Sequence, residues 1–242
     1  MTDGQSIPWK RISVEAAAIV ASILLAFAID AWWDERQERR EESEILAGLL
    51  EEFRLNKTLL EDRLAGHEDS QRLYRSLLVA AYSDSWQDHD VDIELTLNWM
   101  LAPSTTDLGG GVLAGLINSG RIELLSSRAL RERLTDWEGV FGEVRDDEVF
   151  IAETISDRVI PYLLSRQVPL GGVFKAEGVD WPASARTLSN DADALSRLMT
   201  DPEFLTLVEL RYGYADHATG EFEQAIRAAD DILAEINRSI SD

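Results

Sequence analysis

Residue types that commonly carry catalysis or bind metals are sparse in this sequence. The three histidines, His67, His89 and His217, lack the spacing of a shared metal site, and no HExxH or ExxH motif occurs. The nucleophile motif GxSxG is absent as well. Without cysteine there is no thiolate, disulfide or cysteine metal site, and cysteine usage does not indicate whether the protein resides in an oxidising or a reducing compartment. The sequence therefore predicts a protein that is not an enzyme and that uses no cofactor and no metal.

A run of aspartates is the nearest approach to a metal-binding loop. Its order, Asp88-x-Asp90-x-Asp92, is similar to the start of a calcium-binding loop. However, Ile93 replaces the glycine that should follow the third acid, and Trp99 stands where the closing glutamate is required. We therefore expect a solvated acidic loop.

Other clusters have a structural explanation that is simpler than a binding site. Gly109, Gly110 and Gly111 are not followed by the lysine and Ser/Thr of a phosphate-binding loop, so we expect a loop that leads into a helix. The charged run at residues 145–148 is interpreted as the solvated start of a helix. Three aromatic residues of the last helix are expected in the core rather than in a ligand cage: Tyr212, Tyr214 and Phe222.

The balance of charge excludes whole classes of partner. With 45 acidic against 23 basic residues, the chain carries a net charge of −22. Such a chain offers no basic face to nucleic acid, and anionic lipid headgroups repel an acidic domain. Its 242 residues suffice for one domain with a hydrophobic core.

One stretch, residues 12–33 (ISVEAAAIVASILLAFAIDAWW), differs from the rest because it is almost entirely apolar. A bilayer core of ~30 Å needs about 20 such residues in a helix, and Trp32 and Trp33 stand where interfacial aromatic residues are found. We therefore expect a transmembrane helix over residues 12–33, preceded by a tail at 1–11. The alternatives are a cleaved signal peptide, a buried helix of a soluble protein, and an amphipathic helix in the membrane plane.

The expected transmembrane helix has two different faces. Ala18, Ser22 and Ala26 form a stripe of small residues that allows another helix to approach closely. Glu15 and Asp30 extend this face at its two ends, and ionisable residues within a membrane are costly and commonly functional. We predict that this face docks on another membrane helix, from a second copy or a partner subunit. The alternative is a passive anchor whose acids lie at the interfaces.

Behind the apolar stretch the sequence predicts helices alone. Residues 34–44 have no apolar stripe and are expected to be a solvated stalk, whereas 45–242 are expected to form an acidic bundle domain. The first helix continues through the stalk with an apolar stripe at Leu46, Leu49, Phe53, Leu60 and Leu64. Asn56 interrupts this stripe, either to fix a coiled-coil register or, as we prefer, as an amide bonded to a neighbouring backbone.

The closing helix is expected to start at Asp201-Pro202-Glu203, which combines a cap, a proline at the first position and an acid. Its apolar and small residues then alternate in steps of three and four: Leu205, Val208, Tyr212, Ala215, Thr219, Phe222, Ile226, Ala229, Leu233, Ile236 and Ile240. This 3.5-residue period is typical of helices packed along one another. We predict that the closing helix packs antiparallel to the first, in an all-α, up-and-down antiparallel bundle.

Between the two long helices the sequence predicts shorter elements. The first helix should continue over 67–82, and further helices should cover 91–101, 112–118, 128–141, 143–166 and 184–199. Gly120 should provide a left-handed cap, Ser126-Ser127 should cap the next helix, and Pro161 should kink the helix that contains it. No segment alternates with a period of two, so no sheet is expected.

Two phrases of the sequence carry a resemblance to a known family. They are ILLAFAIDAWWDERQER with the following LLEEFRLNKTLLE, and LAGLINSGRIELLSSRALRERLTDW. Together they resemble an uncharacterised bacterial family of single-span membrane proteins, in which Glu precedes the span, a polar residue and Trp close it, and Asn follows in the next helix. Glu15, Asp30, Trp33 and Asn56 occupy these places. The resemblance implies a single-span topology and an α-helical domain, but no reaction.

These features favour a membrane-anchored, non-catalytic scaffold or accessory subunit that binds partner proteins through its transmembrane face and its acidic domain. We expect it in the bacterial inner membrane, with the N-terminus in the cytoplasm and the bundle in the periplasm. Basic residues on the two sides of the span nearly balance, so this orientation depends on the short tail and the large domain. The alternative is an extracytoplasmic sensor or small-ligand-binding module, with a pocket lined by Tyr212, Tyr214 and Trp137.

Overall fold

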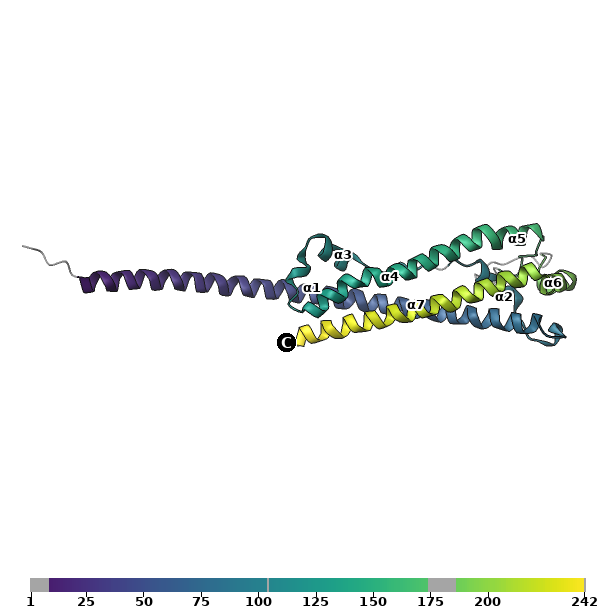
Figure 1. Ribbon diagram of the computed structural model, residues 1–242, viewed down its shortest axis with the longest axis horizontal. Coiled ribbons are helices and arrows are strands. Elements are labelled where there is room, and N and C mark those ends of the chain that lie inside the picture. The colour runs from purple at the N-terminus through teal and green to yellow at the C-terminus, as the bar shows by residue number, and fades with distance from the viewer. Residues whose placement is uncertain (1–8, 104, 174–185, 242) are drawn as a thin grey trace, which may run out of the picture.

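The structure, a computed structural model, describes residues 9–103, 105–173 and 186–241; of residues 9–18 it describes the backbone alone. All regular secondary structure in these ranges is helical, and no strand occurs in them. Figure 1 shows an elongated bundle from which one helix projects far beyond the rest. The predicted all-α helical bundle is therefore confirmed. Residues 1–8 of the predicted tail lie outside the described residues.

A single helix, α1 (Trp9–Ala81), forms both the projection and one side of the bundle (Figure 1). It has 73 residues, which at 1.5 Å per residue makes it about 110 Å long. No proline interrupts it, so nothing in the sequence breaks the backbone hydrogen bonds. Among the described side chains of α1, the first to be buried is that of Ile45.

The closing helix, α7 (Pro202–Ser241), lies antiparallel to α1 along the bundle, and its C-terminus lies near the point where α1 leaves the bundle (Figure 1). Its predicted start is confirmed, because the Asp201 carboxylate accepts a hydrogen bond of 2.9 Å from the Glu203 N–H. The predicted antiparallel pairing of the two long helices is confirmed as well.

The contact between α7 and its neighbours has the predicted 3.5-residue period, but several positions differ from the prediction by one residue. Buried residues follow one another in steps of four and three: Phe204, Val208, Arg211, Ala215, Ala218, Phe222, Ala225, Ala229, Ile232 and Ile236. Partly buried instead are Tyr212, Thr219, Ile226 and Leu233. Small side chains let helices pack closely, which explains why Ala218 and Ala225 lie inside while larger neighbours lie at the margin.

The shorter helices are α2 (Ile93–Leu101), α3 (Gly111–Asn118), α4 (Arg128–Thr154), α5 (Ile160–Ser165) and α6 (Ala192–Met199). Single 3-10 turns are η1 (Trp86–Asp88), η2 (Arg121–Leu124) and η5 (Leu188–Asn190). Gly120 follows α3 with a φ of +70°, in the left-handed region that was expected for a glycine cap. The Ser127 hydroxyl caps α4, because it accepts a hydrogen bond of 3.2 Å from the Leu130 N–H.

The predicted separation of residues 128–141 from 143–166 is wrong. Helix α4 continues to Thr154 and passes directly into the π-helical turn η3 (Ile155–Val159) and then into α5. Gly139 and Gly142 lie within α4, because an isolated glycine weakens a helix without ending it. The disturbance expected at Pro161 takes the form of the π turn immediately before it, since proline has no N–H to continue the regular pattern.

The helix predicted over 184–199 begins later than expected. Helix α6 starts at Ala192, where the Asp191 carboxylate accepts a hydrogen bond of 2.9 Å from the Ala194 N–H. The preceding residues include the 3-10 turn η5, and residues 184–185 lie outside the described residues. The cap at Asp191 therefore sets the boundary that the apolar pattern alone did not locate.

Two hydrophobic clusters lie one behind the other along the bundle. The cluster nearer the projection includes Phe53 of α1, Trp137 of α4 and Phe222 of α7. The distal cluster includes Tyr74 of α1 and Phe204 of α7, together with residues of α2, α5 and α6. The two long helices therefore contribute to both clusters and hold them in line.

In the part of the chain that the structure describes, no helix is long and apolar enough to cross a membrane. The expectation of a transmembrane helix over residues 12–33 is not supported by this finding. The side chains of residues 12–18, the first third of that stretch, lie outside the described residues.

Candidate functional site

The five residues predicted to form a docking face lie in the projecting part of α1. Glu15, Ala18, Ser22, Ala26 and Asp30 follow one another at intervals of three or four residues within one helix, so they share a face. The side chains of Glu15 and Ala18 lie outside the described residues, and those of Ser22, Ala26 and Asp30 are exposed. The bundle does not reach this part of α1 (Figure 1).

The same part of α1 exposes large apolar side chains in every direction. Between 50% and 66% exposed are Ile19, Val20, Ile23, Leu24, Leu25, Phe27, Ile29, Trp32 and Trp33. The rings of Trp32 and Trp33, the predicted interface anchors, have centroids 6.4 Å apart. The Arg36 guanidinium lies 5.6 Å from the centre of the Trp32 ring, a cation–π distance. The apolar segment thus ends in two indoles and a cation.

Two polar residues of α1 position the start of α3 inside the bundle. The Glu52 carboxylate accepts hydrogen bonds from the N–H groups of Val112 (2.7 Å) and Leu113 (3.3 Å). The buried Asn56 amide donates a hydrogen bond of 2.7 Å to the Gly109 carbonyl. The glycine-rich segment is therefore a loop that leads into a helix, as predicted, and Asn56 bonds to a neighbouring backbone, as we preferred.

The charged run at residues 145–148 is not a solvated helix start, since it lies in the middle of α4. Glu148 is buried and accepts hydrogen bonds from both the N–H and the hydroxyl of Thr106. Asp147 is half-buried, and burial raises the pKa of its carboxyl, which lies 3.9 Å from His217 Nε2. Only the first two residues of the run, Arg145 and Asp146, are exposed. The spacing could have indicated that Glu148 is buried, because it lies four residues after Val144 on the inner face of α4.

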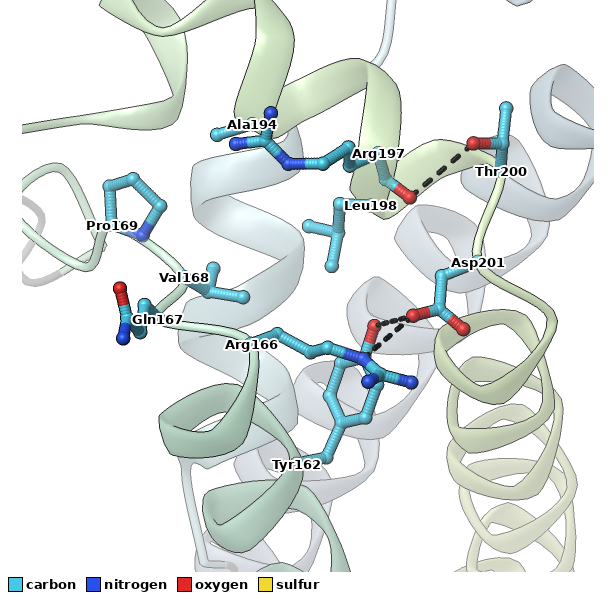
Figure 2. A pocket seen from close by; sticks show the side chains of 10 residues that line it. All are labelled: Tyr162, Arg166, Gln167, Val168, Pro169, Ala194, Arg197, Leu198, Thr200 and Asp201. Atoms are coloured by element: carbon cyan, nitrogen blue, oxygen red, sulfur yellow. Dashed lines mark hydrogen bonds and ion pairs between the residues drawn. The ribbon is translucent and has the colours of Figure 1, made fainter.

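A pocket of about 390 Å³ lies between the end of α5, α6 and the start of α7, and Figure 2 shows the residues that line it. The Tyr162 hydroxyl and the Arg166 Nε each donate a hydrogen bond of 3.0 Å to the Asp201 carboxylate. Arg166 also donates one of 2.8 Å to Glu203, and burial, aided by Asp201, raises the pKa of Tyr162. Two acids neutralise Arg166, and their bonds to Tyr162 and Arg166 connect α5 to α7. The exposed Arg197 lies at the other side of the pocket.

A second cavity, of about 360 Å³, lies between α1, the end of α2, α4 and α7. Arg211 lines it and is only 7% exposed. Its Nη2 donates to the Trp99 carbonyl at 3.1 Å and lies 3.5 Å from the Tyr74 hydroxyl, whereas its buried Nε has no hydrogen-bond partner among the described residues. The sequence pattern favours Tyr212 for this inward position, so Arg211 was not predicted.

His67 lines the same cavity from α1 and is buried beside Phe222, with ring centroids 5.0 Å apart. Burial lowers the pKa of its imidazole to about 4, and the nearby positive charges of Arg211 and Arg63 act in the same direction. The imidazole is therefore neutral near pH 7. Arg211 is thus the buried cation of this cavity.

The remaining predicted clusters do not form a site. In the segment before α2, Asp92 caps that helix, and Asp88 accepts a hydrogen bond of 2.7 Å from the Ser85 hydroxyl. No group of three or more histidines or acids within the described residues is placed to hold a metal ion. The three aromatic residues expected to line a sensor pocket, Tyr212, Tyr214 and Trp137, have different neighbours among the described residues. Phe53 and Phe141 pack on Trp137, Phe150 packs on Tyr214, and Tyr212 borders the distal cluster.

Comparisons with known proteins assign this chain to no family. No family model matches it, and neither a curated protein nor a solved structure matches it. The resemblance to a bacterial family of single-span membrane proteins therefore stays a prediction.

Proposed function

We propose that this chain is a membrane-anchored, non-catalytic scaffold or accessory subunit. One observation carries the proposal: the projecting part of α1 exposes large apolar side chains on all its faces, away from the bundle (Figure 1). A helix that is hydrophobic all round is stable only where it is surrounded by lipid or by other protein. Each such side chain that leaves water gains about 1.5–3 kcal/mol. We infer that a bilayer surrounds this segment.

The proposed anchor comprises residues 12–33, and the sequence of residues 12–18 completes the apolar segment that is exposed from Ile19 onward. These 22 residues span about 33 Å as a helix, against about 30 Å of bilayer hydrocarbon. Trp32, Trp33 and Arg36 would then lie at the interface, where indoles and arginine are favoured. The proposed location is the bacterial inner membrane, with the N-terminus in the cytoplasm and the bundle in the periplasm.

The proposed partners are membrane proteins or a second copy of this chain. Ala18, Ser22 and Ala26 would permit close helix packing, and a partner helix would shield Glu15 and Asp30 from lipid. The acidic bundle would provide a second contact, since the chain carries a net charge of −22 and favours a basic surface. The proposed mechanism is binding alone.

The anchor is tested first, by fractionation. Full-length protein should sediment with membranes, resist extraction at high salt and pH, and enter the soluble fraction only with detergent. Full-length, unprocessed protein that stays in the supernatant without detergent would refute the anchor and, with it, the docking face.

The docking face is tested separately, by co-purification from membranes in a mild detergent. The double substitution Ser22→Leu with Ala26→Leu should abolish co-purification of partner proteins, because bulky side chains prevent close approach. The matched control, Ile23→Leu with Phe27→Leu, changes another face of the same helix and should leave co-purification intact. Equal recovery of partners with both variants would contradict the proposal.

A further inference from the structure

The Arg211 side chain is a buried charge for which the described residues supply no acidic partner. An arginine cannot lose its proton in a protein, and burial of an unpaired charge costs several kcal/mol. Among the described residues, no carboxylate oxygen lies within 4.0 Å of a guanidinium nitrogen of Arg211, which is the limit for an ion pair. Its described partners, the Trp99 carbonyl and the Tyr74 hydroxyl, are both neutral. Arg211 therefore presents a positive charge to this cavity that no described carboxylate balances.

The cavity beside Arg211 has room for a small molecule that would supply this charge. Its volume of about 360 Å³ lies within the range of small-molecule sites. The buried part of the lining has an apolar side, formed by the half-buried Trp99 with Ile151 and Ala215, beside the polar His67 and Ser70. Gly66 allows the Trp99 indole to lie directly on α1, since a Cβ there would lie only 3.2 Å from the ring. A ligand with an apolar body would fit against these residues.

Charges at the opening of the cavity restrict the ligand further. Asp62 and Asp69 line the outer part, and both are exposed, as is Arg63. Asp69 is paired with Arg72 of the next turn. Because Arg72 balances Asp69, the opening offers little net positive charge, and any repulsion from Asp62 grows with the charge of the ligand. A ligand with one negative charge is therefore disfavoured least. A single carboxylate also matches the planar donor geometry of one guanidinium.

From these observations we propose that the cavity between α1, α2, α4 and α7 binds a small organic monocarboxylate. The ligand carboxylate would accept hydrogen bonds from the Arg211 guanidinium, which lines the cavity. The apolar part of the ligand would lie against Trp99 and Ile151. This site is independent of the proposed membrane anchor, because all its residues belong to the bundle.

The test is isothermal titration calorimetry on the full-length chain in a nonionic maltoside detergent, with benzoate as the probe. Benzamide has the same shape without the charge and should bind about tenfold more weakly or not at all. Inorganic phosphate tests the alternative of a general anion site. Failure of benzoate to saturate the protein by about 10 mM, or tighter binding of phosphate than of benzoate, would overturn the proposal.

Two variants assign the binding to this cavity. Arg211→Met removes the charge at similar length and should lose benzoate binding by about tenfold or more, with Tm unchanged or higher because no unpaired charge remains buried. Ala65→Phe places a ring at the opening and should weaken binding, whereas Ala47→Phe, also at an exposed position of α1, should not. Wild-type affinity in Arg211→Met would overturn the proposal. If that variant does not fold, equal affinities of the two phenylalanine variants would do so.

Discussion

Glu148 holds Thr106 by two hydrogen bonds, one of 3.0 Å from its backbone N–H and one of 2.6 Å from its hydroxyl. Glu148 lies in the middle of α4, and Thr106 lies in the loop between α2 and α3. Both side chains are buried, so the carboxylate has exchanged water for these two donors. The pair therefore fixes a loop that has no regular structure to the side of the bundle.

Thr106→Val should destabilise the bundle by about 1–3 kcal/mol, because it removes one donor to a buried carboxylate and keeps the size of the side chain. The measurement is the free energy of unfolding in urea, followed by circular dichroism on full-length protein in nonionic detergent. Thr135→Val is the control, since Thr135 is exposed on α4 and bonds only within its own helix. A loss of the same size in both variants would show that the pair with Glu148 contributes nothing particular.

Stability should depend on pH through His67. Its pKa is about 4 in the folded protein against an ordinary value of 6.5, with burial as the main cause. Between these values the unfolded chain binds the extra proton, so stability is complete above pH 6.5 and falls as pH drops toward 4. The full loss is about 3 kcal/mol, from 1.36 kcal/mol for each pKa unit.

Urea denaturation at several pH values between 7.5 and 4 checks this dependence. His67→Gln cannot titrate, so the difference in unfolding free energy between wild type and this variant should change across the window. His89→Gln removes an exposed histidine and should leave the pH dependence as it is. Parallel pH profiles for wild type and His67→Gln would contradict the low pKa.

The long helices could be predicted from the sequence because each carries a regular apolar pattern and a clear start. The Asp201-Pro202-Glu203 cap and the 3.5-residue period located α7 and its pairing with α1. The side of α7 that faces the core could not be predicted in the same way. Ala225 and Ile226 are both apolar, and only their packing against α1 decides which of them is buried. Helix continuity at Gly142 also depends on such packing, because a glycine is tolerated where neighbouring turns are held in place.

The candidate sites were harder to predict for a related reason. Arg211, Glu52 and Glu148 are charged residues, and an isolated sequence assigns charged residues to the surface. Their partners lie far away in the chain: the Trp99 carbonyl, the N–H groups at the start of α3, and Thr106. Sequence patterns report local periodicity, whereas these contacts exist only after the helices have packed.

Shortening the Ile232 side chain tests which side of α7 faces the core. Ile232 is buried at 1% exposure, and Ile240 on the same helix is 52% exposed. Ile232→Ala should therefore cost about 2–5 kcal/mol of unfolding free energy, and Ile240→Ala should stay within about 0.5 kcal/mol of wild type. Urea denaturation distinguishes the two, and a larger loss from Ile240→Ala would contradict the observed packing.

The start of α3 should depend on the Glu52 carboxylate, which bonds to the N–H groups of Val112 and Leu113. A negative charge at a helix N-terminus is favourable because unpaired N–H groups and the helix dipole converge there. Glu52→Gln keeps the shape and removes the charge, so the Val112 and Leu113 amides should exchange hydrogen faster, by about tenfold for each 1.4 kcal/mol lost. Glu51→Gln changes the exposed neighbour and should leave exchange in α3 at its wild-type rate. Hydrogen exchange followed by mass spectrometry resolves these amides, and identical protection in wild type and Glu52→Gln would mean that the charge does not hold α3 in place.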